Sequence, residues 1–369
     1  MSEFPPDPSP AAGRPRKSRW FWAVLRLLIA AAGLGYIAYS VRWRPFVDEQ
    51  GVTQPGFLEL LGDASWWGLL AVVGCMAPLV PLAAARWWVL LRGVEIDVGY
   101  ARVLRLTWMG QFLNYAVPVG STGGDVVRAV VAAKWGRAQR RDDEPDRPGN
   151  MGGALLSLVA DRGCGMAGLV LLASLAAATR LDDPLSRRVA LIGGALVLAG
   201  LSAMAIYGWL GTSATRRLSF LRQVRLIGAL AGSLLDTAEA YRRRRFGPVL
   251  VAWGLGLTIH VALAGAAVAA AWALGAGFAP GAVFVAVPVA LAAASIPLTY
   301  QGLGVMEGIA VLMLGVGDDP ALTNAVFAVF LIHRLALVTV SLPGAWVLAR
   351  RERSEKPQAQ RASENPSSA

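Results

Sequence analysis

Histidine, cysteine and charge are all scarce in this chain of 369 residues, which contains two histidines and two cysteines. His260 and His333 are too few for a histidine-rich metal centre. Cys75 and Cys164 lie inside apolar segments, where neither a disulfide framework nor a cysteine metal site of the usual spacing is expected. We therefore expect the two cysteines to be packing residues and predict no cofactor. For His333 the expected role is also packing, with a part in the site as the alternative.

Charged side chains make up only 16% of the sequence, against about 25% in soluble proteins. Hydrophobic residues account for 55%, and the mean hydropathy is +0.50. This composition indicates a membrane protein that crosses the bilayer several times. The net charge of +11 could suggest nucleic-acid binding, but the Lys and Arg residues lie in short segments between apolar runs. They fit topology signals and attraction to anionic lipid, so we expect no nucleic-acid partner.

Six apolar runs reach the ~20 residues that a helix needs to cross a ~30 Å hydrocarbon core. They lie at about residues 20–41, 66–91, 151–178, 189–210, 248–275 and 322–348. We predict that all six are transmembrane helices.

Two further apolar segments are interrupted in their middle. Residues 106–133 have basic flanks on both sides, which belong on the same side of a membrane. Folded in half at Pro118 to Gly124, they give arms of about 14 residues, or ~20 Å, which reach about the midplane. Residues 281–316 are broken around Ser295 to Gly308 and should begin and end on the other side. We predict two oppositely oriented re-entrant hairpins.

The predicted fold class is therefore an all-α polytopic membrane protein with about six full spans and two broken hairpins. One transmembrane domain should cover residues 20–349, between disordered tails at 1–19 and 350–369. An amphipathic segment at about 214–245 should lie on the cytoplasmic surface. The distribution of Lys and Arg places both termini in the cytoplasm, in a bacterial-type inner membrane.

The two predicted hairpins give the chain two similar halves of opposite orientation, which is typical of secondary transporters. Asp161 and Arg162 lie about as deep in the span after the first hairpin as His333 and Arg334 lie in the span after the second. This favours an inverted repeat. The alternative is chance, because the two halves show no residue-level similarity.

The charges at membrane depth are the candidate site residues, since an unpaired charge in hydrocarbon costs a few kcal/mol or more. Adjacent helical positions point about 100° apart, so Asp161 and Arg162 each need a partner elsewhere. The candidate partners of both signs are Asp125, Arg128, Glu307 and Arg334. Two interpretations stay open: ion pairs that lock helices together, or arginines that bind an anionic headgroup beside acids that gate or titrate. The set comprises Arg86, Asp125, Arg128, Asp161, Arg162, Glu307 and Arg334.

The glycines at the two breaks allow tight turns and close backbone approach, and the helices beyond them could offer free amides to an anion. The string GSTGGD resembles a phosphate loop only superficially. It lacks the Lys and Ser/Thr of a Walker motif, and no strand precedes it, so we expect no nucleotide hydrolysis.

These residues resemble a known family, the transmembrane flippase domain of lysylphosphatidylglycerol synthases and its free-standing relatives. The resemblance covers about residues 20–350, and its most specific parts are the patterns GGDxxR and GxGxxE. The matching residues are Arg86, Trp87, Asn114 to Pro118, Gly123, Gly124, Asp125, Arg128, Asp161, Arg162, Pro297, Gly302, Gly304, Glu307 and Arg334.

The resemblance implies lipid translocation between leaflets, with a substrate that differs among members. Only about twenty polar residues follow the membrane part, where the two-domain synthases carry an aminoacyl-transferase domain. The resemblance therefore implies that synthase activity is absent, and we expect no enzyme activity.

We accordingly predict a flippase-like protein that admits an anionic phospholipid or a polyprenyl-phosphate-linked lipid to a central charged cavity. Its partners would be membrane lipids. The alternative is a non-transporting subunit that anchors or regulates a lipid-modifying enzyme. The predicted substrate-binding residues are Arg86, Asn114, Gly123, Gly124, Asp125, Arg128, Asp161, Arg162, Gly302, Gly304, Glu307 and Arg334.

Overall fold

The protein is an all-α polytopic membrane protein, as the sequence predicts. The computed structural model describes residues 35, 38–116, 123–138, 149–223, 228–242, 244, 246–295 and 302–349. Within these ranges, five helical segments are long and apolar enough to cross a membrane. They match five of the six predicted spans. Most of the predicted span at 20–41, both predicted tails, and Pro118 and Pro297 lie outside the described residues.

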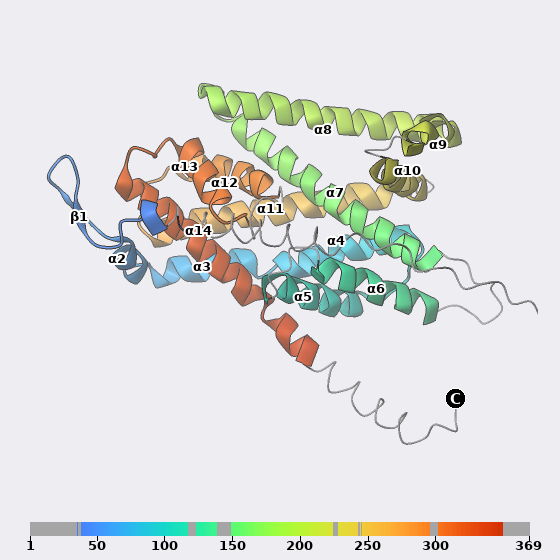
Figure 1. The fold of residues 1–369 in the computed structure, drawn as a ribbon, viewed down its shortest axis with the longest axis horizontal. Helices are drawn as coiled ribbons and strands as arrows, with labels where there is room; N and C mark the ends of the chain where they lie inside the picture. The colour runs from blue at the N-terminus through green and yellow to red at the C-terminus, as the bar shows by residue number, and fades with distance from the viewer. Residues whose placement is uncertain are drawn as a thin grey trace, which may run out of the picture.

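The long helices run side by side as a bundle (Figure 1). The first crossing is made of two consecutive helices that meet at Ala77 and Pro78, because proline interrupts the helical hydrogen-bond pattern. The elements are α3 (Trp66–Met76), α4 (Leu79–Gly93), α7 (Gly149–Ala177), α8 (Pro184–Leu210), α11 (Gly247–Ala273) and α14 (Pro320–Ser341).

Two of these helices begin in the same way, with an aspartate followed by a proline. The Asp183 carboxylate accepts hydrogen bonds from the backbone amides of Leu185 and Ser186 at the start of α8. Asp319 caps α14 in the same manner. Proline suits the first helical position because its missing N–H would have no partner there. Both boundaries therefore follow from local sequence.

Each predicted hairpin is a pair of adjacent helices, with the predicted break between them. The first pair is α5 (Tyr100–Ala116) and α6 (Gly123–Ala138), and the second is α12 (Pro280–Ala294) and α13 (Val305–Leu314). At 1.5 Å per residue these helices are about 15–25 Å long, too short for an untilted crossing of ~30 Å. The first pair extends beyond the predicted 106–133 at both ends.

The two pairs open toward opposite ends of the bundle (Figure 1). The short connection from Gly93 to Gly99 joins α5 to the end of α4. There Gly93 packs against Tyr241 and against Pro248, the second residue of α11. The connection from Leu274 to Ala279 joins α12 to the other end of α11. Re-entry of these pairs into a membrane is still a prediction.

Smaller elements cover the two ends of the bundle. A two-stranded antiparallel sheet, β1 (Phe46–Val47) and β2 (Thr53–Gln54), precedes α2 (Phe57–Gly62) at one end. This sheet was not predicted. At the other end lie α9 (Thr212–Leu218), the 3-10 turn η1 (Ser219–Gln223) and α10 (Gly228–Arg242). They occupy the predicted amphipathic segment, and Tyr241 ties α10 to the core by donating a 2.9 Å hydrogen bond to the Leu90 carbonyl.

Candidate functional site

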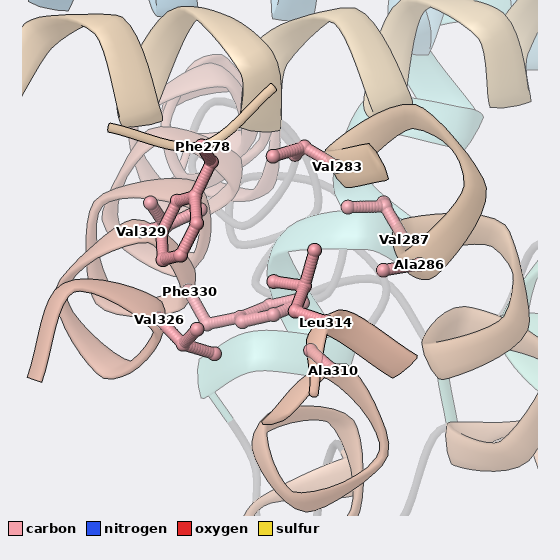
Figure 2. A pocket seen from close by; sticks show the side chains of 9 residues that line it. All are labelled: Phe278, Val283, Ala286, Val287, Ala310, Leu314, Val326, Val329 and Phe330. Atoms are coloured by element: carbon pink, nitrogen blue, oxygen red, sulfur yellow. The ribbon is translucent and has the colours of Figure 1, made fainter. Parts of the chain in front are cut away.

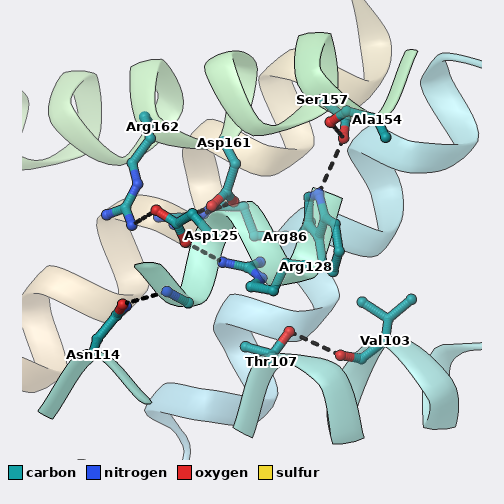
Figure 3. Close-up of polar contacts among 12 residues, drawn as sticks. Arg86, Val103, Thr107, Asn114, Asp125, Arg128, Ala154, Ser157, Asp161 and Arg162 are labelled. Carbon is teal, nitrogen blue, oxygen red and sulfur yellow. Dashed lines mark hydrogen bonds and ion pairs between the residues drawn. The ribbon is translucent and has the colours of Figure 1, made fainter. Parts of the chain in front are cut away.

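Arg86 and Asp161 form the most buried ion pair of the first half of the chain (Figure 3). Arg86 Nε donates to Asp161 Oδ1 at 2.7 Å, and Nη2 donates to Oδ2 at 3.2 Å. The two side chains are 12% and 3% exposed. Two parallel bonds between planar groups fix both side chains, and the pair joins α4 to α7.

Asp125 lies between two arginines at the first turn of α6. Its Oδ1 accepts from Arg128 Nη1 at 3.2 Å, and its Oδ2 accepts from Arg162 Nη2 of α7. Arg162 is 57% exposed, whereas Asp125 is 13% exposed. The acid therefore links a buried arginine to one that faces outward.

Arg128 is buried at 7% exposure and is only partly satisfied. Its guanidinium carbon lies 4.2 Å from the centre of the Trp87 ring, and Trp87 Nε1 donates to Ser157 Oγ at 3.1 Å. Stacking on an aromatic face stabilises a desolvated cation by about 2 kcal/mol. Arg128 Nε and Nη2 are buried without a hydrogen-bond partner among the described residues.

The two helices of the first pair touch at glycines, which brings Arg128 against α5. A Cβ atom on Gly124 would lie 2.2 Å from the Gly110 carbonyl oxygen, and one on Gly110 would lie 2.8 Å from Arg128 Cδ. Asn114 Oδ1 accepts from the Gly124 amide at 3.1 Å. Gly123 is the first residue of α6. The predicted glycines and Asn114 therefore shape the first turn that carries Asp125.

A second, smaller charge cluster occupies the start of α13. Glu307 Oε1 accepts from Arg334 Nη2 at 2.9 Å and from Nε at 3.2 Å, with 4% of Glu307 and 19% of Arg334 exposed. Glu307 Oε2 also accepts from the Gly304 amide at 2.9 Å. Gly302 and Gly304 have φ angles of 69° and 80°, which favour glycine. This break therefore depends on its predicted glycines.

The two clusters have corresponding contacts. Asp125 is the third residue of α6, and Glu307 is the third residue of α13. Each acid pairs with an arginine of the next long helix, Arg162 in α7 and Arg334 in α14. This correspondence supplies the residue-level likeness between the halves that the sequence lacks, and it supports the predicted inverted repeat.

The predicted site residues thus form two groups. Asp161 pairs with Arg86, which was not among the partners expected from the sequence, whereas Arg162 pairs with Asp125, which was. Glu307 and Arg334 pair with each other. The contacts around Arg128 also include Trp87, Ser157 and Gly110. Trp87 was noted only in the family resemblance, and Ser157 and Gly110 carry no sequence signal because their role depends on helix packing.

Neither charge cluster coincides with the hollow in Figure 2, which is lined by apolar side chains of the second half, including Phe278, Val326 and Phe330. Among the described residues, no group of three or more His, Cys, Asp or Glu side chains could hold a metal ion. His333 is fully buried and packs beside Phe330, with ring centroids 6.3 Å apart.

Comparison with known proteins matches nearly all of the chain to one family. The family model described as the lysylphosphatidylglycerol synthase TM region matches residues 24–344. A protein of Methanothermobacter thermautotrophicus named "UPF0104 membrane protein" is 31% identical over 85 residues, which cover 23% of this chain and 22% of that protein. Because that family model covers most of the sequence, this chain belongs to the lysylphosphatidylglycerol synthase TM region family.

Proposed function

We propose that the protein moves an anionic lipid between the leaflets of the membrane by binding its headgroup at the Asp125 cluster. We define this cluster as Arg86, Asp125, Arg128, Asp161 and Arg162. The observation that carries the proposal is Arg128, which is buried and has two donors without partners among the described residues. A buried charged group with unmade hydrogen bonds is costly, and an anionic ligand would remove that cost.

We propose different roles for the arginines on the basis of their contacts. Arg86 donates two hydrogen bonds to Asp161, and Arg334 donates two to Glu307. These ion pairs would hold α4 to α7 and α13 to α14. Arg162 pairs with Asp125 but is largely exposed, so a ligand could reach it first. Arg128 would then bind the headgroup in the interior. Asp125, which contacts both arginines, would connect the two positions.

Broken helices related by opposite orientation are a feature of transporters, whose binding sites lie near the bilayer midplane. The opposite openings of the two helix pairs support this proposal, and an acid–arginine pair involves the start of the second helix of each pair. A cytoplasmic-membrane location with the arginine-rich end of the bundle inside completes the proposal.

The test uses purified protein in liposomes that contain a fluorescent phosphatidylglycerol. Wild-type protein should expose label from the inner leaflet to a membrane-impermeant quencher. Arg128→Ala should reduce that rate about tenfold to a hundredfold, because hydrogen bonds to charged groups contribute about 1.5–3 kcal/mol. Arg102→Ala on α5 is the matched control, since Arg102 is exposed, and its rate should equal that of wild type. An unchanged rate in folded Arg128→Ala would overturn the assignment of the site.

A second candidate is a non-transporting subunit that anchors or regulates a lipid-modifying enzyme. The observation that favours it is the exposed mixture of charge and apolar surface at the end of the bundle, with Arg216, Arg217 and Phe220 exposed. Absence of transport by folded wild-type protein, together with retained lipid binding, would favour this candidate.

A further inference from the structure

The Asp125 cluster carries one positive charge more than it can neutralise by itself. Its three arginines face two aspartates, and every carboxylate oxygen of these aspartates accepts from a guanidinium. Counted at their formal charges, three arginines and two aspartates leave the cluster with a net charge of +1. Arg162 is 57% exposed, so water solvates part of its charge. The unmet demand for an anion falls on Arg128, which is buried with two donors unpartnered among the described residues.

The open donors of Arg128 also have a defined shape. Nε and Nη2 lie on the same edge of the guanidinium plane, and both are buried without partners in the described part of the chain. Arg86 uses this same edge to hold both oxygens of Asp161. The free edge of Arg128 is therefore suited to an anion that presents two oxygens side by side.

The second half of the chain serves as an internal comparison. Glu307 corresponds to Asp125 and pairs with Arg334, but Ala310 stands three residues after Glu307 where Arg128 stands three residues after Asp125. One acid and one arginine leave no excess charge there. Of the two clusters, only the first combines a spare charge with an open guanidinium edge among the described residues. Packing alone would require only the same kind of ion pair in both halves.

We infer that the Asp125 cluster selects a singly charged phosphodiester and discriminates against phosphomonoesters and diphosphates. This inference rests on the proposed function and narrows its substrate to one class. A phosphodiester has one negative charge and two free oxygens, which match the net charge and the open edge. A phosphomonoester carries a charge of about −1.5 to −2 at neutral pH, so the cluster would leave part of that charge unpaired.

The test compares phosphatidylglycerol, a diester, with phosphatidic acid, a monoester, both with the same acyl chains. Purified protein in detergent is incubated with an equimolar mixture, and the retained lipid is measured by native mass spectrometry at pH 8. Wild-type protein should retain the diester roughly tenfold more than the monoester, as expected for one unmatched buried charge. Equal retention, or a preference for the monoester, would overturn the inference.

Two charge variants separate the net charge from general damage to the site. Asp125→Asn raises the cluster to +2 and should shift the ratio toward phosphatidic acid. Arg162→Gln lowers it to zero and should weaken retention of both lipids. Arg102→Gln removes one exposed arginine outside the cluster. It should change neither the diester-to-monoester ratio nor the amount of lipid retained. An unchanged ratio in folded Asp125→Asn would contradict selection by charge.

Lowering the pH gives a test that needs no variant. A phosphomonoester approaches a single charge below its second pKa of about 6, so wild-type retention of phosphatidic acid should rise toward that of the diester between pH 8 and pH 5.5. Retention of phosphatidylglycerol should stay constant over this range. A constant ratio of the two lipids would contradict the inference even if no variant folds.

Soluble competitors identify the source of the anion. Glycerophosphoglycerol should compete with the lipid, whereas inorganic phosphate should compete less well. Oleate tests the carboxylate alternative, and stronger displacement by oleate than by the diester would overturn the assignment to phosphodiesters. If wild-type protein retains none of these lipids, the proposed function itself fails. If it transports lipids without preferring the diester, only the narrower inference fails.

Discussion

Arg86 Nε lies 2.7 Å from Asp161 Oδ1 in a two-pronged pair that crosses from α4 to α7 with both side chains nearly removed from solvent. A cavity-facing charge pair of a transporter and a structural lock between helices would look alike in a sequence. Here Arg86 donates to Asp161 from both Nε and Nη2, so the pair fixes α4 against α7. The same two atoms of Arg128 have no partner among the described residues.

The first prediction concerns this pair. Arg86→Gln should lower the free energy of unfolding by about 3–5 kcal/mol, because it leaves the Asp161 carboxylate buried without a partner. The double variant Arg86→Gln with Asp161→Asn should recover much of that loss. The measurement is thermal unfolding in detergent, followed by a thiol-reactive dye that reaches buried Cys164 only when the bundle opens. Equal stability of the single and double variants would contradict an ion-pair origin.

The second prediction assigns a positioning role to Trp87. Trp87→Leu removes both the aromatic face under Arg128 and the bond to Ser157, and it should weaken phosphatidylglycerol binding by roughly tenfold or more. Trp87→Phe keeps an aromatic face and should retain most of the binding. The distinguishing readout is the diester-to-monoester ratio, which should stay constant in both variants because the cluster charge is unchanged. Similar binding by the Leu and Phe variants would argue against stacking.

The third prediction concerns the contact between α5 and α6. Gly124→Ala places a methyl group where a Cβ would lie 2.2 Å from the Gly110 carbonyl oxygen, and such overpacking costs about 1–3 kcal/mol. The helices must separate, so lipid transport should fall together with stability. Gly163→Ala in α7 is the matched control, because nothing lies within 4 Å of a Cβ added there. Its stability should equal that of wild type or exceed it slightly.

The fourth prediction tests whether the first helix pair enters and leaves the membrane on the same side. In a cysteine-free background, single cysteines at Gly99 and Gln139, on either side of the first pair, should both react with a membrane-impermeant reagent from the cytoplasm. A cysteine at Leu181, which is 50% exposed in the connection between α7 and α8, should react only from outside. Labelling of Gly99 and Gln139 from opposite sides would mean that the first pair crosses the membrane.

Much of the architecture follows from the sequence because the hydrocarbon core imposes strong and local rules. A run of about twenty apolar residues is expected to form a helix there, because hydrocarbon offers no hydrogen-bond partners to the backbone N–H and C=O groups. The aspartate–proline pairs at Asp183 and Asp319 mark helix starts for equally local reasons. The two interrupted segments could also be recognised. The first has basic flanks that belong on one side, and the second was placed by the orientation of its neighbouring spans.

The partners of the charges could not be recognised in this way. Asp161 and Arg162 are neighbours in sequence yet bind arginine and aspartate from different helices, because their side chains diverge around the helix axis. Which arginine stays open depends on how α4, α6 and α7 pack, and that packing depends on close contacts such as Gly110 with Gly124. A contact between distant helices has no local signature in a single sequence.

The sequence by itself determined the membrane class, five described spans, the two interrupted helix pairs and the family, because these depend on composition, hydrophobic run length and short motifs. Only the tertiary structure decided that Arg86, Arg162 and Arg334 are paired while Arg128 keeps two buried donors unpartnered among the described residues. The physical reason is that hydrocarbon requires a charge to be paired but does not specify its partner. The packing of the helices makes that choice.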